Sequence, residues 1–344
     1  MLGKEAEKAR PYGPRGDLMR RMRWVLLCLV PILILGGTVQ GGEQPVRLFD
    51  KEYDFWSCDW SPDGRYLALA GKTHNQPADK TRIWLSRNGS DKPILLTNTD
   101  YLSDDWPRWS PDGAHIAMSR KDLNNRRVCV WMKNIQTGVG YRLTKGPDDR
   151  QPSWSPDGRL LVFRRGLGTD RSSLVTIDVV KGMVTVLPLA DGMFGEPFWG
   201  TDGNIYYTRY QSIQRESKAG NKTYYVPETG GRLCWFNPSA GQGGQVLTED
   251  FDQRMPVLSP DGQWLAFYGR RDQLGTSPSI PDPEQWALFV RGQITQNCTE
   301  LLSNVALTGG APSWSRDGKT IIIYSLRRIA PALWSYAIGE EPGK

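Results

Sequence analysis

The sequence contains very few of the side chains from which common catalytic centres are built. Histidine occurs only twice in 344 residues, at His74 and His115, so the chain lacks the material for a histidine-based metal cluster. The Gly-x-Ser-x-Gly elbow of the α/β hydrolases is also absent. We therefore predict a protein without a Ser-His-Asp triad and without a histidine-bound metal, which favours a non-enzymatic role.

Cysteine is scarce as well, and its spacing indicates no disulfide framework. Cys28 lies near the N-terminus, while Cys58, Cys129, Cys234 and Cys298 are spread along the rest of the chain. The four cysteines that follow Cys28 are an even number, which permits disulfides if the protein is exported. We expect buried free thiols, with a bridge between Cys234 and Cys298 as the alternative.

A strong charge of one sign is missing from most of the chain. The net charge is +6, but residues 1–24 hold seven Lys or Arg against three Asp or Glu, and the remainder carries only +2. Proteins that bind nucleic acid usually present a clearly basic face to the phosphate backbone. We therefore predict that nucleic acid is not a partner of this protein.

What the sequence does contain is an internal repeat. The pentapeptide Trp-Ser-Pro-Asp-Gly, with small variations, occurs six times, at 60–64, 109–113, 154–158, 199–203, 258–262 and 314–318. Pro presets φ, Asp bonds its own backbone and Gly accepts a positive φ, so each copy predicts a hairpin turn. The turn aspartates recur in every copy, and we assign them to structure: Asp63, Asp112, Asp157, Asp202, Asp261 and Asp317.

The spacing of these turns indicates the fold. Successive turn aspartates are 49, 45, 45, 59 and 56 residues apart, and a four-stranded antiparallel propeller blade takes about 40 to 50 residues. An apolar run of strand type follows each turn, as in Leu160–Phe163. The sequence therefore predicts an all-β, six-bladed β-propeller over residues 45–344, with the repeat tryptophans packed between blades. The sixth copy lacks a fourth strand, so we expect Val46–Asp50 to supply it and close the ring.

These motifs resemble those of the TolB-like six-bladed β-propellers, which are built from WD40-like Pro-Asp repeats. The nearest match is Arg142-Leu143-Thr144 followed by Gly146-Pro-Asp-Asp149 and the turn at 154–158, and the resemblance covers Val46 to Ile338. It implies binding of cell-envelope proteins, of which a peptidoglycan-associated lipoprotein is one kind. TolB itself has an α/β domain before its propeller, and here only 44 residues precede the first blade. We therefore expect a TolB-like propeller without that domain.

Residues 1–44 have the pattern of an export signal. A basic stretch, Met19–Arg23, precedes an uncharged run, Trp24–Thr38, and small residues follow. The run has about 15 residues, fewer than the roughly 20 that span a bilayer as a helix. We expect either a signal peptide cleaved near Val39–Gly41 or an uncleaved membrane anchor at 24–38, and in both cases an exported propeller. The true start is Met1, Met19 or Met22.

Two copies of the repeat are longer than the others. A polar segment at 211–222 and a Pro-rich segment at 277–284 both fall between the second and third strands of their blades. We expect loops at both places. Long loops on a rigid scaffold can bind partners, and the alternative is that they are tolerated insertions.

Acidic residues lie where the chain enters the innermost strand of five blades. These entries converge at one end of the channel of a propeller, so the acids would form a partial ring, broken at Gly309–Ala311 of the sixth blade. Such a ring suits Ca²⁺ or a basic peptide, whereas the alternative is that each acid only caps its own turn. The candidate binding residues are Asp54, Asp104, Asp105, Asp148, Asp149, Glu196, Asp250 and Asp252, with Arg150 and Arg254 pairing some of the acids.

Taken together, these features predict an exported, non-catalytic propeller that serves as a protein-binding or scaffold module in the periplasm or at the cell surface. We expect a monomer with an envelope protein or peptide as partner, and no cofactor unless Ca²⁺ occupies the acidic rim. The alternative is a carbohydrate-active enzyme, a lyase or glycosidase, that uses two acids of the rim. One acid with a strongly raised pKa, next to a second acid on a neighbouring loop, would favour that alternative.

Overall fold

The computed structural model describes residues 45–77, 80–87, 92–168, 171–219, 222–248, 251–270, 286–305, 309–325 and 332–338. For residues 212–219, 222–229 and 304 it describes the backbone alone. The N-terminal segment 1–44, the Pro-rich segment 277–284 and Asp250 lie outside the described residues. Within the described ranges, no helix is long and apolar enough to span a bilayer.

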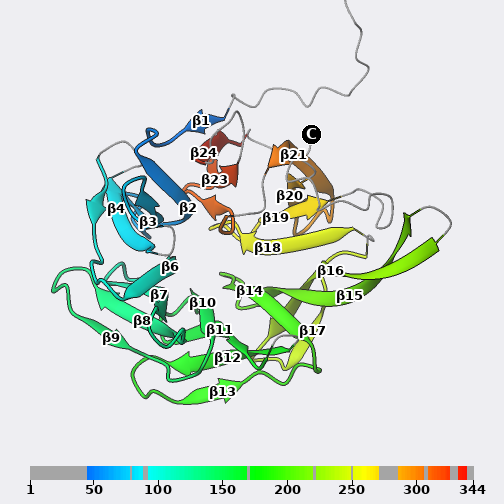
Figure 1. Cartoon of the computed structure of the whole chain (residues 1–344), viewed down its shortest axis with the longest axis horizontal. Coiled ribbons are helices and arrows are strands. Elements are labelled where there is room, and N and C mark those ends of the chain that lie inside the picture. The colour runs from blue at the N-terminus through cyan, green and yellow to red at the C-terminus, as the bar shows by residue number, and fades with distance from the viewer. Residues whose placement is uncertain are drawn as a thin grey trace, which may run out of the picture. The chain divides into compact units, whose positions relative to one another are not determined.

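The described chain from residue 45 onward folds into six four-stranded antiparallel sheets around a common axis (Figure 1). The first three blades are β2 (Tyr53–Trp60), β3 (Tyr66–Thr73), β4 (Arg82–Arg87) and β5 (Ile94–Leu95); β6 (Leu102–Trp109), β7 (His115–Asp122), β8 (Val128–Asn134) and β9 (Gly140–Arg142); and β10 (Asp149–Trp154), β11 (Leu160–Gly166), β12 (Ser172–Asp178) and β13 (Val184–Val186). The other three are β14 (Met193–Trp199), β15 (Ile205–Ala219), β16 (Lys222–Asn237) and β17 (Gln242–Gln245); β18 (Asp252–Leu258), β19 (Trp264–Arg270), β20 (Trp286–Gly292) and β21 (Cys298–Val305); and β22 (Ser313–Trp314), β23 (Thr320–Ser325), β24 (Ala332–Ala337) and β1 (Val46–Arg47). The predicted six-bladed propeller is confirmed.

The repeated pentapeptide forms the turn between the first and second strands of each blade. In five turns the Ser hydroxyl donates to the Asp side chain at 2.5–2.6 Å. The same Asp oxygen accepts the N–H two residues further on, as from Arg65 at 3.0 Å, and the Gly follows with a φ near +70°. These hydrogen bonds lower the pKa of Asp63 to about 2. These five turns are therefore stabilised by their own residues.

The ring closes through the two ends of the described chain. β1 pairs antiparallel with β24, Val46 opposite Ser335 and Arg47 opposite Trp334, and Leu48 N–H donates to Leu333 O at 3.1 Å. The regular strand is shorter than the predicted Val46–Asp50, but its place in the last blade is confirmed. The closed ring leaves no unpaired blade at the junction.

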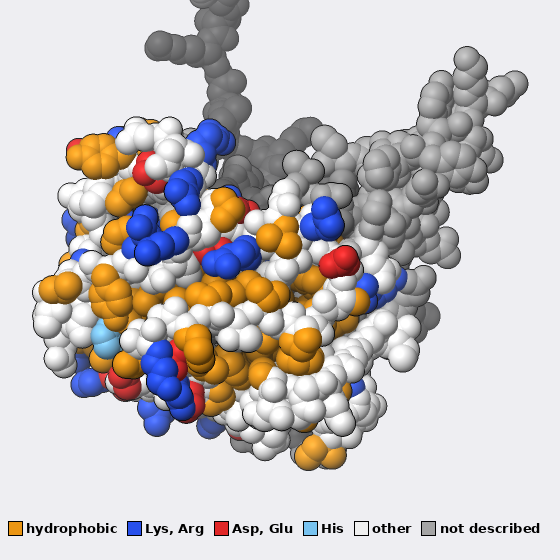
Figure 2. Space-filling view, turned by 90° about the horizontal axis from the view of Figure 1, so that it is seen from below, with side chains coloured by type: hydrophobic (Ala, Val, Ile, Leu, Met, Phe, Trp, Pro, Cys, Tyr) orange, Lys and Arg blue, Asp and Glu red, His pale blue; other side chains and the backbone are white. Residues whose placement is uncertain are grey.

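The core lies between neighbouring blades, as the repeat tryptophans predict. Trp154 of the third blade and Trp314 of the sixth are buried. Their indole N–H groups donate to backbone carbonyls of the preceding blade, Trp154 to Arg108 O at 3.1 Å and Trp314 to Val257 O at 3.2 Å. Figure 2 shows apolar side chains reaching the surface along one side of the ring. The described cysteines Cys58, Cys129, Cys234 and Cys298 are free thiols.

The prediction of a loop at 211–222 is wrong. β15 and β16 continue through this segment as one long hairpin, in register from Ile205 opposite Phe236 to Ala219 opposite Lys222 (Figure 1). The polar composition indicated a loop because it offers no buried face. The backbones of the two arms nevertheless pair as a continuous antiparallel ladder.

Candidate functional site

Five of the six innermost strands carry the same irregularity. In β2, β6, β10, β14 and β18 the pairing with the next strand shifts register, which marks a β-bulge. In four of them a non-glycine residue before a proline has positive φ: Trp106 (56°), Gln151 (58°), Glu196 (47°) and Met255 (58°). This left-handed backbone is unfavourable for L-residues, and a residue before proline normally stays extended. The surroundings must therefore hold these residues in place.

Side chains of the preceding blade hold these bulges. Gln151 N–H donates to Ser119 Oγ at 2.8 Å, and Met255 N–H donates to Thr208 Oγ1 at 3.2 Å. Glu196 N–H donates to the Gln151 side-chain oxygen at 3.0 Å. These three bulges are thus held by the assembled ring, whereas Trp106 N–H donates to Asp105 of its own strand at 2.7 Å.

The residue before the bulged position differs from blade to blade. We call these six residues the axial set, because they come from the strands or strand entries nearest the ring axis (Figure 1). Three members of the set contact one another: Trp56 Nε1 donates to Asp105 Oδ1 at 3.2 Å, and Gly310 N–H donates to Trp56 O at 2.6 Å. The axial set consists of Trp56, Asp105, Arg150, Gly195, Arg254 and Gly310.

Asp105 is the electrostatically unusual member of the axial set. Burial raises its pKa to about 6, from an ordinary value of 3.8. Hydrogen bonds from Trp106 N–H at 2.7 Å and from Trp56 Nε1 oppose this rise, as does the charge of Arg150, but they do not cancel it. A carboxyl group with such a pKa changes charge near neutral pH, which is common at functional sites.

Several of the predicted rim acids lie in the innermost strands and are paired with arginines. Asp104 is fully buried and binds Arg120 through two hydrogen bonds of 2.5 and 2.8 Å. Asp149 binds Arg165 in the same way at 2.7 and 2.9 Å, with no exposed surface of its own. Each ion pair joins the first and second strands of its own blade, the second blade for Asp104 and the third for Asp149. They neutralise the acids in place.

Two more rim acids pair with the arginines that the sequence placed beside them. Asp148 contacts Arg150 and also Arg164, at 3.2 Å. Asp252 accepts from Arg254 at 2.7 and 2.9 Å, and from Gly231 N–H at 2.7 Å. The end of the ring where the innermost strands begin is therefore a mixture of acids and arginines, rather than a ring of free carboxylates.

Glu196 belongs to an aromatic cluster instead. The Tyr210 hydroxyl donates to both of its carboxylate oxygens, at 2.6 and 2.8 Å, and burial with the nearby carboxylate raises the pKa of Tyr210 well above its usual value. Arg254 lies over the Tyr210 ring and over the Trp286 ring, 5.3 and 5.1 Å from their centroids. These contacts combine a cation with two aromatic faces.

Asp54 is half-buried in β2, and its Oδ1 atom has no hydrogen-bond partner in the described part of the chain. Among the described residues, no three His, Cys, Asp or Glu side chains cluster closely enough to hold a metal ion. The Ca²⁺ site stays a prediction, because Asp250 is outside the described residues.

Sequence reasoning missed Trp56, Tyr210 and Trp286. Trp56 has the one signal that could have found it, since the same repeat position holds an acid, an arginine or a glycine in other blades. Tyr210 and Trp286 reach Arg254 from strands that are distant from it in sequence. Only the folded ring shows this proximity.

Comparison with known proteins gives relatives of low identity. The chain is 24% identical over 187 residues to an uncharacterised peptidase, YuxL, of Bacillus subtilis, and this match covers 47% of the chain but only 28% of YuxL. It is 23% identical over 270 residues to the uncharacterised protein Atu1656 of Agrobacterium fabrum, covering 77% of the chain and 82% of that protein. No family model matches the chain.

Solved structures match the fold over most of the chain. A TolB-type protein from Agrobacterium tumefaciens superposes with a TM-score of 0.61 at 17% identity, covering 85% of this chain and 92% of that one. TolB from Acinetobacter baumannii gives 0.58 at 16%, covering 86% and 65%. An oligogalacturonate lyase from Vibrio parahaemolyticus gives 0.54 at 13%, covering 86% and 94%. At these identities the likeness concerns architecture, and the chain is a six-bladed β-propeller with the fold of the TolB proteins.

Proposed function

We propose that the chain is an exported, non-catalytic propeller that binds a segment of a partner protein at the axial set. The observation that carries this proposal is that one position of a strict repeat holds an aromatic, an acid, two arginines and two glycines. Residues that serve only the fold recur from blade to blade, as the turn aspartates do. A position that is rigidly held and does not recur is available for recognition.

The side chains of the axial set suit a protein partner. Trp and Arg, with Tyr, dominate the binding energy of protein interfaces, and here Trp56 and Arg254 are half-buried while Arg150 is exposed. Because the neighbouring acids are largely neutralised by arginines, a segment with charges of both signs fits better than a purely basic peptide. Asp105 would receive the cation of the segment, and Arg150, which is exposed although it pairs with Asp148, would receive its carboxylate.

Capture from an envelope extract tests this proposal. Asp105→Ala and Arg150→Ala should each lower the recovery of one partner at least about tenfold relative to the unchanged protein. Lys181→Ala, which removes an exposed charge after β12, is the matched control and should recover the partner normally. Equal recovery by all four proteins would place the binding surface elsewhere.

A second candidate, a carbohydrate lyase or glycosidase, is favoured by the raised pKa of Asp105. The fold likeness to an oligogalacturonate lyase is compatible with it. Incubation with oligogalacturonate, followed by the ultraviolet absorbance of an unsaturated product, separates the two candidates. Product that disappears with Asp105→Asn would favour the enzyme, and the binding proposal expects none.

Export is the second part of the proposal, and it rests on the order of basic, apolar and small residues in 19–42. The mass of the intact protein recovered from cells tests it. We expect a species that lacks the residues up to about Gly41, or a full-length species in the membrane fraction. A full-length protein in the cytosolic fraction would contradict export.

A further inference from the structure

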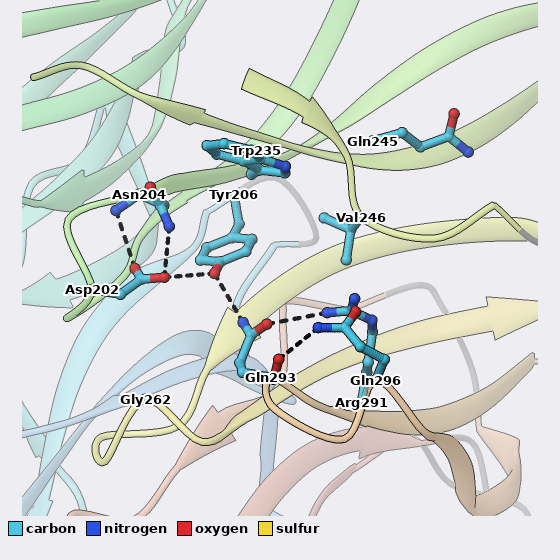
Figure 3. Close-up of a pocket in the computed structure, with 10 residues that line it drawn as sticks. All are labelled: Asp202, Asn204, Tyr206, Trp235, Gln245, Val246, Gly262, Arg291, Gln293 and Gln296. Carbon is cyan, nitrogen blue, oxygen red and sulfur yellow. Dashed lines mark hydrogen bonds between the residues drawn. The ribbon is translucent and has the colours of Figure 1, made fainter. Parts of the chain in front are cut away.

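A pocket of about 360 Å³ lies between the fourth and fifth blades, at the end of the ring where the repeat turns lie (Figure 3). The pocket lies beyond the C-terminal end of β14, after Trp199, whereas Glu196 and Gly195 of the axial set lie in the middle of that strand. Pockets that bind small molecules typically begin at about 300 Å³. Its wall includes Tyr206, Trp235, Arg291 and Gln293, and none of these belongs to the site described above.

The fourth turn departs from the repeat at this pocket. Gly200 and Thr201 replace the usual Ser and Pro, so the serine that normally donates to the turn aspartate is missing. The Tyr206 hydroxyl takes over this role and donates to Asp202 Oδ2 at 2.7 Å. At the position of Tyr206 the other five blades have buried aliphatic residues: Leu67, Ile116, Leu161, Leu265 and Ile321.

Arg291 is the second unusual residue of this pocket. It is only 8% exposed, and its Nε atom has no hydrogen-bond partner in the described part of the chain. One terminal nitrogen donates to the Gln293 side-chain oxygen at 3.1 Å, but no described carboxylate forms an ion pair with the guanidinium. Burial lowers the pKa of Arg291. A buried cation without an anion is unfavourable, which indicates that a ligand supplies the missing charge.

The remaining walls offer a flat ring and amide groups. Figure 3 shows Trp235 and Arg291 on opposite sides of the pocket, with Gln293 between the blades. Gln293 Nε2 donates to the Tyr206 hydroxyl at 2.9 Å, which links the two blades. A Cβ at Gly244 would lie 3.3 Å from the Trp235 indole nitrogen, so glycine there leaves the edge of that ring uncovered.

We propose that this pocket binds an acidic sugar, a pyranose that carries one carboxylate. The guanidinium of Arg291 pairs with the carboxylate, and the Trp235 ring packs against the C–H face of the sugar. The amides of Asn204, Gln293 and Gln296 are hydrogen-bonded within the protein, and their second N–H groups and lone pairs meet the sugar hydroxyls. Asp202 lies in the same pocket, so a phosphate with two charges would be repelled. The proposal is independent of binding at the axial set.

Calorimetric titration of the full chain with methyl glucuronide tests the proposal, with methyl glucoside, acetate and adenosine monophosphate as comparison ligands. We expect the glucuronide to bind at least about tenfold more tightly than the other three. Equal binding of the neutral glucoside would mean that Arg291 does not recognise the carboxylate, which contradicts the proposal. Stronger binding of acetate or of the nucleotide would mean that the pocket recognises an anion other than an acidic sugar. No binding of the glucuronide would overturn the proposal.

Matched variants locate the site. Arg291→Met should abolish glucuronide binding and raise the melting temperature of the free protein, because it removes an uncompensated buried charge. Lys133→Met removes a cation at the same repeat position of the second blade and should leave binding unchanged. Trp235→Leu should weaken binding of glucuronide while acetate titrations stay the same. Arg291→Met protein that binds as before would refute the assignment.

Discussion

Asp105→Asn should make the protein more stable at neutral pH, and the sign of this effect follows from its surroundings. The folded protein keeps the Asp105 proton up to about pH 6, whereas the unfolded chain releases it near the ordinary pKa of 3.8. Between these values the folded state binds more protons than the unfolded state. The free energy of unfolding therefore falls as pH rises through this window.

The magnitude follows from the size of the shift. A difference of about two pKa units corresponds to ~3 kcal/mol, and the half-buried position of the side chain makes this an upper limit. Asparagine keeps an oxygen that accepts from Trp106 N–H and Trp56 Nε1, but it carries no charge. We therefore expect Asp105→Asn to raise the free energy of unfolding by about 2 kcal/mol at neutral pH and by close to zero near pH 4.

Urea unfolding of both proteins at about pH 7.5 and pH 4 measures this difference. Asp63→Asn is a control of opposite sign, because hydrogen bonds lower the pKa of Asp63 to about 2. Its stabilising contribution is present above pH 4 and is lost as pH falls towards 2, so this variant should be less stable at pH 7.5. If Asp105→Asn were destabilising at pH 7.5, or equally stabilising at both pH values, the account of a buried, charged Asp105 would be wrong.

Two further predictions concern the fold around the site. Asp104→Asn should lower the free energy of unfolding by about 3 kcal/mol in urea titrations, because it leaves the Arg120 charge unpaired next to a fully buried side chain. A loss below about 1 kcal/mol would mean that water solvates the ion pair in the folded protein. Gly71→Ala should lower the melting temperature by about 5 °C, since its Cβ would overlap the Asp54 carbonyl oxygen and lie 2.8 Å from Phe55 Cα. Gly140→Ala is its control, with the nearest atom 3.6 Å away, and an equal effect of the two substitutions in calorimetry would contradict the packing argument.

The fold could be predicted because its determinants are local and repeated. The turn serine and aspartate bond to each other two residues apart, as Ser155 Oγ does to Asp157 at 2.6 Å, and the glycine follows at once. Such a turn can be recognised from the sequence wherever it occurs. Its recurrence gives the number of blades. The strand that completes the last blade follows from the missing strand of the sixth copy.

The candidate site was harder to predict because neighbouring acids have different roles. Asp104 and Asp105 are adjacent in sequence, yet one is buried against Arg120 and the other contacts Trp56 of the neighbouring blade. A β-bulge sets which side chain faces which way, and a shift of one residue reverses the arrangement. The sequence shows the acids but not the register. Arg120, the partner of Asp104, is 16 residues away on the next strand.

The hydrogen bonds that fix the axial set are not legible in sequence either. Ser119 and Thr208 are ordinary strand residues, and their contacts with Gln151 and Met255 form only when the blades pack together. The same holds for the pocket between the fourth and fifth blades. There the available signal was a departure from the repeat, Gly200-Thr201 in place of Ser-Pro, and a departure alone does not say what it serves.

Site-specific photo-crosslinking in cells tests the central claim, recognition at the ring axis, most directly. A photoreactive phenylalanine analogue at Trp56, in the axial set, is compared with the same analogue at Tyr141, which is 42% exposed on β9. The account predicts that one partner protein is crosslinked at position 56 and not at position 141, and that Arg150→Ala removes this crosslink. A partner crosslinked at position 141 and never at position 56 would contradict it.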